Sequence, residues 1–481
     1  MTRSAAAAVA ALLVFPAVSA ARSAFTPSDP LVPKQYYLQQ DHAFDAFPDG
    51  PPVLNPVRVA IIDSGLDGTH PEFPAAKIWA ARSFVGGSAK TDEQGHGTFV
   101  AGEIAAAMNN DQGIAGIAFP AQLVIAKIAR ADASISIQDE ADAIRWAVDI
   151  GAKVINLSFG GVRDPRDPSN DTFAPEEASA IEYAVRHGVV VVAVTGNSDE
   201  APTKPWPWAD YPAALPHVIG VSALTPSGDV PAFSDRDPIY NDLSAPGQGI
   251  YSTIPLPLSR PGCAHPGYSD CGPLELRAGA GTSFAAPQVT AAAALLLALR
   301  PSLKADQVAT ILERSTDDVT ASNGCNQCRP GRDPYSGWGR LNIAKAIAAL
   351  DQPLPPADRL EPNDDAGFHA PLLTTRTKTI KPTLDYWDDN VDVYRVRLVR
   401  GQRFRISTTG PAGTTTNLLL WKPGTTSVND IRTQGMRAAQ SLGRGALHRI
   451  SYRVRKTGTY YVQVKLTTPG SGSYTLTLAR K

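Results

Sequence analysis

Three side chains suited to nucleophilic catalysis stand in three short, glycine-containing segments of this chain. They are the carboxylate of Asp63 (IIDSG), the imidazole of His96 (GHGT) and the hydroxyl of Ser283 (GTSFAAP). A serine hydroxyl is a poor nucleophile at neutral pH and needs a positioned base, which an imidazole provides. A carboxylate can orient that imidazole and stabilise its charged form. Together the three residues predict attack by the Ser283 oxygen on a carbonyl carbon.

Two hydrogen-bond donors could stabilise the negative charge that this attack creates. Ser283 opens a predicted helix, and a helix N-terminus surrounds the hydroxyl with backbone N–H groups and a positive field. Asn197 follows an apolar run at 191–194, and its side-chain amide can donate beside the N–H of Ser283. Taken singly, Ser283 could be a helix cap and Asn197 a turn residue. The prediction therefore depends on the segments occurring together.

Asp63 and His96 are each expected at the end of an element. Asp63 ends an apolar β run, where a carboxylate is costly unless it is paired. His96 opens a predicted helix, where we expect the pKa of the imidazole to be lowered, so that it is a neutral base near pH 7. The chain has 8 histidines, and only His96 lies between two glycines.

Short apolar runs rich in β-branched residues predict the strands that position these segments, at 57–62, 123–128, 154–159, 189–194 and 218–221. The runs are apolar on both faces, as in parallel strands that helices cover on each side. Amphipathic helices are predicted at 138–150 and 175–187. This alternation predicts an α/β fold with a doubly wound, mostly parallel sheet. Ligands bind at the carboxyl ends of such strands, where Asp63 and Asn197 are expected.

The alternation stops near Leu350, where the composition of the chain changes. A proline-rich segment at 351–357 predicts a stiff linker. Beyond it, short alternating runs separated by turn residues predict a small all-β sandwich domain at 358–481. Before the linker we expect an N-terminal extension at 21–56 and the α/β domain at 57–350.

Composition and charge exclude several classes of protein. The chain has 481 residues, of which 43% are hydrophobic and 19% charged, and this argues against disorder. Lys and Arg number 45 and Asp and Glu 46, so there is no electrostatic reason to expect nucleic acid or an anionic membrane as a partner. No feature of the sequence predicts assembly, and we expect a monomer.

The N-terminus has the pattern of an export signal. Arg3 precedes an apolar stretch at 5–18, and small residues at 18–20 stand where a signal peptidase cuts. A buried alanine-rich helix is the alternative. No other run reaches the roughly 18 apolar residues of a membrane span. We therefore expect a signal peptide at 1–20 and a secreted mature protein without a membrane span.

The four cysteines fit an exported protein and fall into two local pairs. We expect disulfides between Cys263 and Cys271 and between Cys325 and Cys328, although four cysteines allow three connectivities. Zinc binding at the CxxC of 325–328 is the alternative, but a single CxxC is a weak metal signal.

Residues from about Asp29 to Ala349 resemble the catalytic domain of the subtilisin-like (peptidase S8, subtilase) family. The resemblance rests on the three segments above and on SFGG at 158–161, GN at 196–197 and WGRLN at 338–342. The chain order of aspartate, histidine and serine separates this family from the chymotrypsin and α/β-hydrolase arrangements. The resemblance implies a secreted serine endopeptidase that cuts proteins or peptides through an acyl-enzyme, with no cofactor in the chemistry.

By resemblance, the catalytic residues are Asp63, His96 and Ser283, with Asn197 in the oxyanion hole. A non-catalytic protein that keeps the fold to capture peptides is one alternative, and the presence of all four residues argues against it. A narrow processing enzyme, similar to the secretion-associated mycosins, is another. Those enzymes usually carry a C-terminal membrane helix, which is not predicted here.

The resemblance also implies a substrate site. Ser158, Phe159 and Gly160 would form the edge segment that pairs with an extended peptide through backbone hydrogen bonds. Thr195 replaces a common alanine in the wall of the pocket for the residue preceding the cut bond. We expect Thr195 and Phe159 to influence side-chain preference.

Structural calcium is implied by a likeness to thermitase-type members. Asp29 and Asn110 match the positions of calcium ligands there, whereas Glu72 replaces an expected aspartate. Oxygen ligands of this kind suit calcium, and a plain polar loop is the alternative. The family usually has a folded inhibitory propeptide, for which too few residues separate Ala20 from Asp29.

The C-terminal part, from about Asp358 to Lys481, resembles the bacterial pre-peptidase C-terminal domain. The likeness rests on EPND at 361–364, DVY at 392–394 and GTYYV at 458–462. Such domains often accompany secreted proteases.

Overall fold

A computed structural model describes residues 25–481 of the chain, apart from residues 200, 354–359, 368–369, 375–377 and 388. The predicted signal peptide at 1–20 and most of the predicted linker at 351–357 lie outside the described residues. The predictions for these two segments are therefore not tested by the structure.

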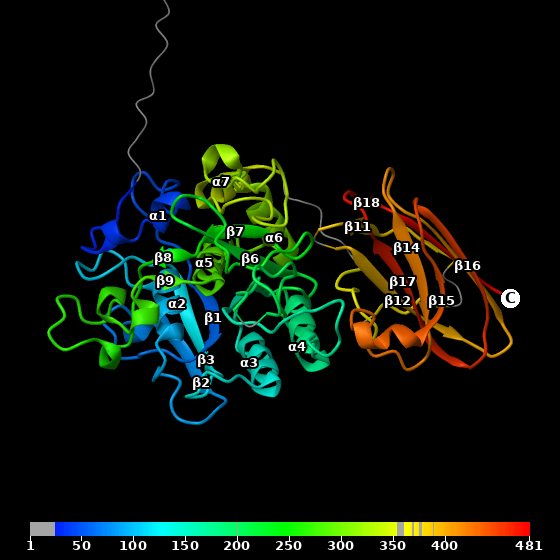
Figure 1. The fold of residues 1–481 in the computed structure, drawn as a ribbon, viewed down its shortest axis with the longest axis horizontal. Coiled ribbons are helices and arrows are strands. Elements are labelled where there is room, and N and C mark those ends of the chain that lie inside the picture. The colour runs from blue at the N-terminus through cyan, green and yellow to red at the C-terminus, as the bar shows by residue number, and fades with distance from the viewer. Residues whose placement is uncertain (1–24, 200, 354–359, 368–369, 375–377, 388) are drawn as a thin grey trace, which may run out of the picture.

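A seven-stranded parallel sheet forms the centre of the N-terminal part (Figure 1). Its strands, in spatial order, are β2 (Ile78–Ser83), β3 (Ala121–Lys127), β1 (Val57–Asp63), β4 (Val154–Leu157), β5 (Val190–Val194), β6 (Val218–Leu224) and β7 (Leu243–Pro246). After β1 the chain forms β2 at one edge of the sheet and then β3 between β2 and β1, whereas β4 to β7 follow one another on the other side of β1. The direction of winding therefore changes between β1 and β4. The predicted doubly wound parallel sheet is confirmed.

Helices cover both faces of the sheet, which is why its strands are apolar on both sides. On β1, Val59 and Ile61 face one core, whereas Ala60 and Ile62 face the other. The first core is covered by α2 (His96–Ala105), α5 (Ala286–Leu299), α6 (Ala305–Arg314) and α7 (Ile343–Ala348). The second is covered by α3 (Ile137–Asp149) and α4 (Pro175–Arg186), which lie side by side in Figure 1.

Helix α5 runs through the first core. In the described part of the chain, the one segment long and apolar enough to cross a membrane is Thr282–Leu299, and 89% of it is buried inside the molecule. A short 3₁₀ turn, η6 (Thr282–Phe284), precedes α5 and carries Ser283. The predicted helix therefore starts three residues later than expected, and Ser283 stands in the turn that leads into it.

Two strands of the sheet were not predicted. They are the edge strands β2 and β7, each covered by a neighbouring strand on one side only. Most residues of β2 are partly or fully exposed, so its sequence lacks the continuous apolar run that marks the central strands. Strand β7 is buried, but its four residues include a serine and a proline, and the run is too short to stand out.

The C-terminal part is built from antiparallel strands, as expected. One sheet has β10 (Thr379–Ile380), β19 (Thr475–Arg480), β13 (Arg403–Thr409) and β16 (Leu447–Arg453). The other has β12 (Val391–Leu398), β17 (Gly458–Leu466), β14 (Thr416–Trp421) and β15 (Arg437–Ser441), and β11 (Thr383–Asp385) pairs with β18 (Ser471–Ser473). Both four-stranded sheets contribute to one core, in which Phe404 and Ile406 of one sheet lie with Val462 and Val464 of the other.

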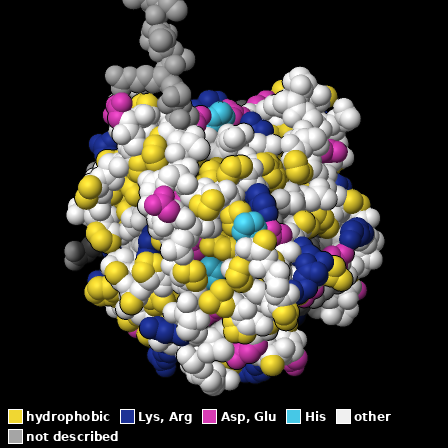
Figure 2. All heavy atoms as spheres, turned by 90° about the vertical axis from the view of Figure 1, so that its left-hand side faces the viewer, with side chains coloured by type: hydrophobic (Ala, Val, Ile, Leu, Met, Phe, Trp, Pro, Cys, Tyr) yellow, Lys and Arg dark blue, Asp and Glu magenta, His cyan; other side chains and the backbone are white. Residues whose placement is uncertain are grey.

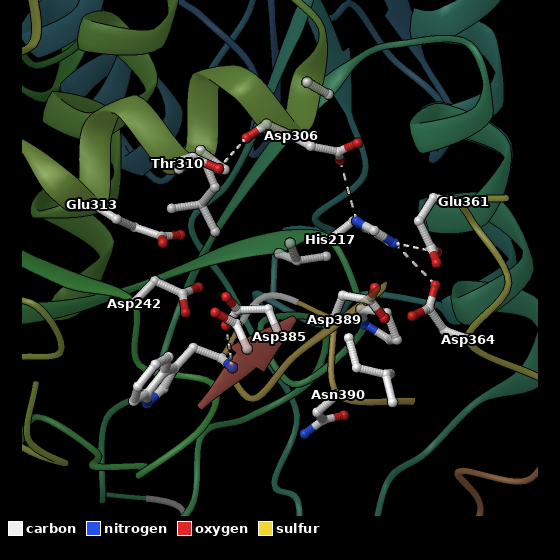
Figure 3. A pocket seen from close by; sticks show the side chains of 18 of the residues that line it. His217, Asp242, Asp306, Thr310, Glu313, Glu361, Asp364, Asp385, Asp389 and Asn390 are labelled. Carbon is white, nitrogen blue, oxygen red and sulfur yellow. Dashed lines mark hydrogen bonds and ion pairs between the residues drawn. The ribbon is translucent and has the colours of Figure 1, made fainter. Parts of the chain in front are cut away.

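The two parts meet at a pocket lined by acidic side chains (Figure 3). His217, in the loop before β6, lies at its edge. The Nδ1 atom of His217 is 3.3 Å from Asp306 of α6, and its Nε2 atom is 3.2 Å from Glu361 and 3.0 Å from Asp364. The rings of Trp338 and Trp387 add a contact between the parts, with centroids 5.0 Å apart.

Both local cysteine pairs are disulfides. Cys263 bonds to Cys271 and Cys325 bonds to Cys328. The predicted local pairing is confirmed. The two sulfur atoms of the CxxC are bonded to each other, and this excludes the alternative that they are free thiolates that bind zinc.

Candidate active site

Asp63 and His96 come together at the carboxyl end of the sheet. Asp63 is the last residue of β1, and His96 is the first residue of α2. The Nδ1 atom of His96 lies 2.8 Å and 3.0 Å from the two carboxylate oxygens of Asp63. Glycine is needed at position 97 because a Cβ atom there would overlap the backbone oxygen of Gly65. The close approach of β1 to α2 thus requires the glycine that follows the histidine.

Asp92, which was not predicted from the sequence, holds this arrangement in place. Its carboxylate accepts hydrogen bonds from the backbone N–H groups of Gly95 (2.8 Å) and Thr98 (2.9 Å), which fixes the start of α2. It also accepts the hydroxyl of Ser64 (2.9 Å), and the Ser64 oxygen in turn accepts the N–H of Gly97 (2.9 Å). Asp92 lies three residues before the N-cap residue, Gly95, so it does not occupy the position in which a capping side chain is recognised from sequence.

The pKa of His96 is raised, whereas the prediction from the sequence was that it is lowered. Burial lowers this pKa, but the Asp63 carboxylate raises it through its charge and its hydrogen bond, and Asp92 adds to the effect. The net result lies above the usual 6.5. The expectation was wrong because it considered only the helix that begins at His96 and left out the carboxylates packed against it. The raised pKa favours the charged imidazole, the form that follows proton uptake from a serine.

Ser283 lies beside the end of β4. Its hydroxyl donates to the backbone oxygen of Ser158 at 3.0 Å, and the Ser158 hydroxyl donates to the backbone oxygen of Ser283 at 2.9 Å. Among the described residues, no hydrogen bond joins Ser283 to His96. The ring of Phe284 lies 5.5 Å from that of His96, centroid to centroid. Hydrogen bonds between catalytic groups are often long or unformed before substrate binds.

Asn197 lies next to the serine segment with its amide nitrogen facing the same space as a backbone N–H. The Asn197 oxygen accepts the N–H (3.1 Å) and the hydroxyl (3.2 Å) of Thr282. This orients the side chain. A Cβ atom placed on Gly281 would lie 3.6 Å from Asn197 Nδ2 and 3.7 Å from Ser283 N, so both donors border the space beside Gly281.

The predicted substrate segment follows β4 directly. Asn156 donates to the Ser158 hydroxyl at 2.8 Å and accepts from Thr290 of α5 at 2.8 Å, which ties the segment to the helix after the serine. Phe159 is half-buried and packs against the second core. Gly160 lies against the side chain of Asp210. A Cβ atom at position 160 would lie 3.0 Å from the Cβ atom of Asp210, so the contact leaves little room for a side chain there.

Thr195 does not present its side chain to a pocket. It is fully buried, and its hydroxyl lies 3.3 Å from the backbone oxygens of Val221 and Asp235. The hydroxyl is therefore directed at the next strand and its loop. Its expected influence on side-chain preference could act only through the backbone that it supports.

The residues of the predicted calcium loop also come together. Asp29 accepts the N–H groups of Asn109 (2.8 Å) and Asn110 (2.9 Å). Glu72 accepts the N–H of Ile114 (3.0 Å), the Asn110 amide (3.2 Å) and the hydroxyl of Tyr268 (2.7 Å). The set is rich in oxygen, as calcium requires. In this structure its carboxylate oxygens accept hydrogen bonds from the chain itself.

Within the described residues, three groups of side chains have ligand atoms close enough to share a metal ion. One is Cys263, Asp270 and Cys271, whose two cysteines are joined in a disulfide. The other two are His217 with Glu361 and Asp364, and Glu361 with Asp389 and Asp392. Both lie at the contact between the two parts of the molecule, away from the candidate catalytic residues.

Residues 55–339 match the model of the subtilase family, Peptidase_S8. This match covers more than half of the chain. The chain belongs to the subtilase family. Members of the family are serine endopeptidases, and the seven-stranded sheet with its flanking helices is the subtilisin fold. The cleavage chemistry of this family needs no cofactor.

Individual relatives agree with this assignment. The chain is 33% identical to subtilisin DY of Bacillus licheniformis over 291 residues, 60% of this subtilase and 90% of that protein. It is 28% identical to a cell wall-associated protease of Bacillus subtilis over 457 residues, 88% of this chain but only 47% of that protein. The chain thus spans about half the length of that relative.

A solved structure from the proteases of Pseudoalteromonas arctica PAMC 21717 superimposes on this subtilase with a TM-score of 0.53 and 25% sequence identity. The superposition covers 68% of this chain and 99% of that one. The likeness is thus confined to about two thirds of the chain. The predicted likeness of residues 358–481 to the pre-peptidase C-terminal domain stays a prediction.

Proposed function

We propose that this subtilase is a secreted serine endopeptidase in which Asp63, His96 and Ser283 form the catalytic triad. The observation that carries the proposal is the contact of both Asp63 oxygens with His96 Nδ1, at 2.8 Å and 3.0 Å. This contact leaves Nε2 as the ring nitrogen that exchanges a proton with Ser283. Asn197 Nδ2 and Ser283 N are the two donors of the oxyanion hole.

The reaction follows from these roles. His96 takes the proton of the Ser283 hydroxyl as its oxygen attacks the carbonyl carbon of the scissile peptide bond. Asn197 and the N–H of Ser283 bind the oxyanion of the tetrahedral intermediate. His96 then gives its proton to the leaving amine, and an acyl-enzyme forms. Water repeats the sequence on the acyl-enzyme and releases the second product. Ser158 to Gly160 hold the substrate backbone in an extended conformation.

Labelling with a fluorophosphonate probe tests the proposal, with Ser283→Ala as the matched variant. We expect the probe to label wild type at Ser283 and the variant not at all, with both folded by circular dichroism. Casein digestion by wild type would support a broad protease, and labelling without casein cleavage would support a narrow processing enzyme. Absence of labelling in folded wild type would contradict the proposal and favour a binding protein.

The export, the partners and the domain limits are part of the proposal. We propose secretion after removal of residues 1–20, a peptidase domain at 57–350 and a β-sandwich domain at 358–481. Figure 2 shows the face of the peptidase part turned away from the C-terminal strands; basic and acidic side chains are interspersed there among hydrophobic ones. That mixture supports protein or peptide substrates rather than nucleic acid, and we propose a monomer.

Structural calcium at the Asp29 and Asn110 loop is a separate proposal, supported by the sequence likeness and the oxygen-rich side chains. The hydrogen bonds that already reach Asp29 and Glu72 weigh against it. Thermal unfolding after dialysis against EDTA decides it. A melting temperature that falls and is restored by calcium would support the ion, and an unchanged one would exclude it.

A further inference from the structure

Two loops that leave neighbouring strands both contact the serine segment, and the interval between them is called the slot. Residues 158–160 follow β4, and residues 195–197 follow β5, its parallel neighbour. The first loop accepts the Ser283 hydroxyl at the Ser158 oxygen, and the second contacts Thr282 through Asn197. When Ser283 attacks a carbonyl carbon whose oxygen lies at Asn197, the side chain of the substrate residue that carries this carbonyl is directed between the two loops. The slot therefore receives the residue that precedes the cut bond.

Asp210 closes this slot. Its N–H donates to the backbone oxygen of Thr195 at 2.8 Å, and the next residue, Tyr211, exchanges two backbone hydrogen bonds with Gly161 (2.8 Å and 2.9 Å). The backbone around Asp210 is thus fixed to both loops. A Cβ atom on Gly160 would lie 3.3 Å from Asp210 Oδ2, and one on Gly196 would overlap the same oxygen. The carboxylate lies against both glycines, at 7% exposure of the residue.

A second carboxylate faces the same glycine. A Cβ atom on Gly196 would lie 2.6 Å from Asp235 Oδ2. Asp235 is fully buried; its Oδ1 accepts the hydroxyl of Ser198, and its Oδ2 has no hydrogen-bond partner among the described residues. Burial raises the pKa of Asp235 to about 7, although the Ser198 hydrogen bond lowers it.

Neither arginine of this region forms an ion pair with Asp235, although the charge of Arg236 lowers the pKa of Asp235. Arg163 pairs with Asp237 at 2.9 Å. Arg236 lies over the ring of Tyr335, 4.8 Å from its centroid. In the part of the chain that the structure describes, Asp235 forms no ion pair. The end of the slot therefore holds two acidic side chains, those of Asp210 and Asp235. Oδ2 of Asp235 accepts no hydrogen bond from the described residues.

We propose that this slot selects a lysine or arginine side chain, so that the enzyme cuts after basic residues, with Asp210 as the specificity-determining residue and Asp235 behind it. The proposal rests on the proposed function, since it needs Ser283 as the nucleophile. An ammonium or guanidinium group between the two loops would donate to the Asp210 carboxylate in a charge-assisted hydrogen bond. A carboxylate in the corresponding pocket gives trypsin its preference for basic residues. Because positions 160 and 196 carry no side chain, the Asp210 carboxylate lies directly against the backbone of both loops.

The test measures kcat/KM on fluorogenic peptides that differ only in the residue before the cut bond: Lys, Arg, Phe, Leu or Glu. Fluorophosphonate labelling of Ser283 counts the active molecules in each sample. In wild type we expect the Lys and Arg peptides to exceed the Phe and Leu peptides at least tenfold. Asp210→Asn should reduce this ratio at least tenfold, and Asp210→Lys should raise the Glu peptide relative to the Arg peptide. Asp142→Asn, an exposed change on α3, should leave the ratio unaltered.

Each outcome decides a different question. A ratio measured within one sample does not change when only the amount of folded enzyme changes. If Asp210→Asn does not fold, the wild-type ratio and competitive inhibition by benzamidine still decide the proposal. Wild type that is labelled but prefers Phe or Leu, or a ratio that Asp210→Asn leaves unchanged, would overturn the specificity alone. Folded wild type without labelling would overturn the proposed function and the specificity with it.

Discussion

At the scale of single residues, the chemistry depends on how carboxylates are paired. Asp63 is paired with an imidazole, Asp92 with backbone N–H groups, and Asp235 with one hydroxyl. In the proposed enzyme these partners give the three aspartates different roles: Asp63 orients the base, Asp92 fixes the start of α2, and Asp235 lies behind the proposed specificity residue. Only Asp63 stands in a sequence motif that indicates its task.

We expect Asp63→Asn to lower kcat by roughly 10⁴-fold with little change in KM, because the imidazole then loses its orienting acceptor. Removal of the carboxylate also removes the main influence that raises the pKa of His96. The acidic limb of the kcat/KM profile should therefore move to lower pH. The profile is measured from pH 4 to 9 on the best peptide substrate, with Asp142→Asn as the control. Retention of a tenth of the activity would contradict the role of Asp63.

At the scale of elements, α3 and α4 pack through a pair of buried acids. Glu140 of α3 and Glu177 of α4 are both buried in the interface, and their side chains face each other. Burial raises the pKa of Glu140 to about 7 and, with the neighbouring Glu140 carboxylate, raises that of Glu177 well above its usual 4.5. A carboxyl group whose pKa is higher in the folded than in the unfolded chain stabilises the folded state below about pH 4.5. This contribution is lost as the pH rises through the pKa in the folded state, about 7 for Glu140.

We expect Glu177→Gln to raise the melting temperature at pH 8 by about 2–4 °C, because an amide keeps a hydrogen bond without a second charge. At pH 5, where both carboxyl groups are protonated, the gain should disappear. Differential scanning calorimetry at both pH values measures the effect. Glu176→Gln is the matched control, since Glu176 is the exposed neighbour on the same helix. An equal gain at both pH values would show that charge is not the cause.

At the scale of the whole molecule, one histidine joins the two parts. His217 belongs to the peptidase part and lies within 3.3 Å of three carboxylates, two of which follow the linker. Burial lowers the pKa of His217, but Asp364, Asp306 and Glu361 raise it well above 6.5. The charged imidazole therefore lies between acidic groups that would otherwise repel one another (Figure 3).

We expect His217→Gln to weaken the contact between the parts, because loss of one partner of a buried ion pair costs about 3–5 kcal/mol. In the Ser283→Ala background, the radius of gyration from small-angle X-ray scattering at pH 6.5 should increase. His187→Gln, an exposed histidine at the end of α4, is the control. An unchanged radius of gyration would show that other contacts hold the parts together.

Much of the site could be predicted because its residues lie in short local segments. The four candidate catalytic residues each lie at the end of a strand or at the start of a helix: Asp63, His96, Asn197 and Ser283. The backbone geometry at these places requires neighbouring glycines, which make the segments recognisable. Asp92 was not predicted, because it lies three residues before the N-cap residue of α2. Asp210 and Asp235 were not, because neither lies in a motif and both become relevant only where two loops meet.

The sequence by itself determined the family, the parallel sheet, the antiparallel C-terminal part and the order of the catalytic segments. Each depends on periodicity or on local motifs, which are properties of neighbouring residues. Only the tertiary structure decided the raised pKa of His96, the inward direction of Thr195, the meeting of Asp210 and Asp235 beside Gly196, and the contact through His217. These depend on charges and distances between residues far apart in the chain, which folding brings together and burial strengthens.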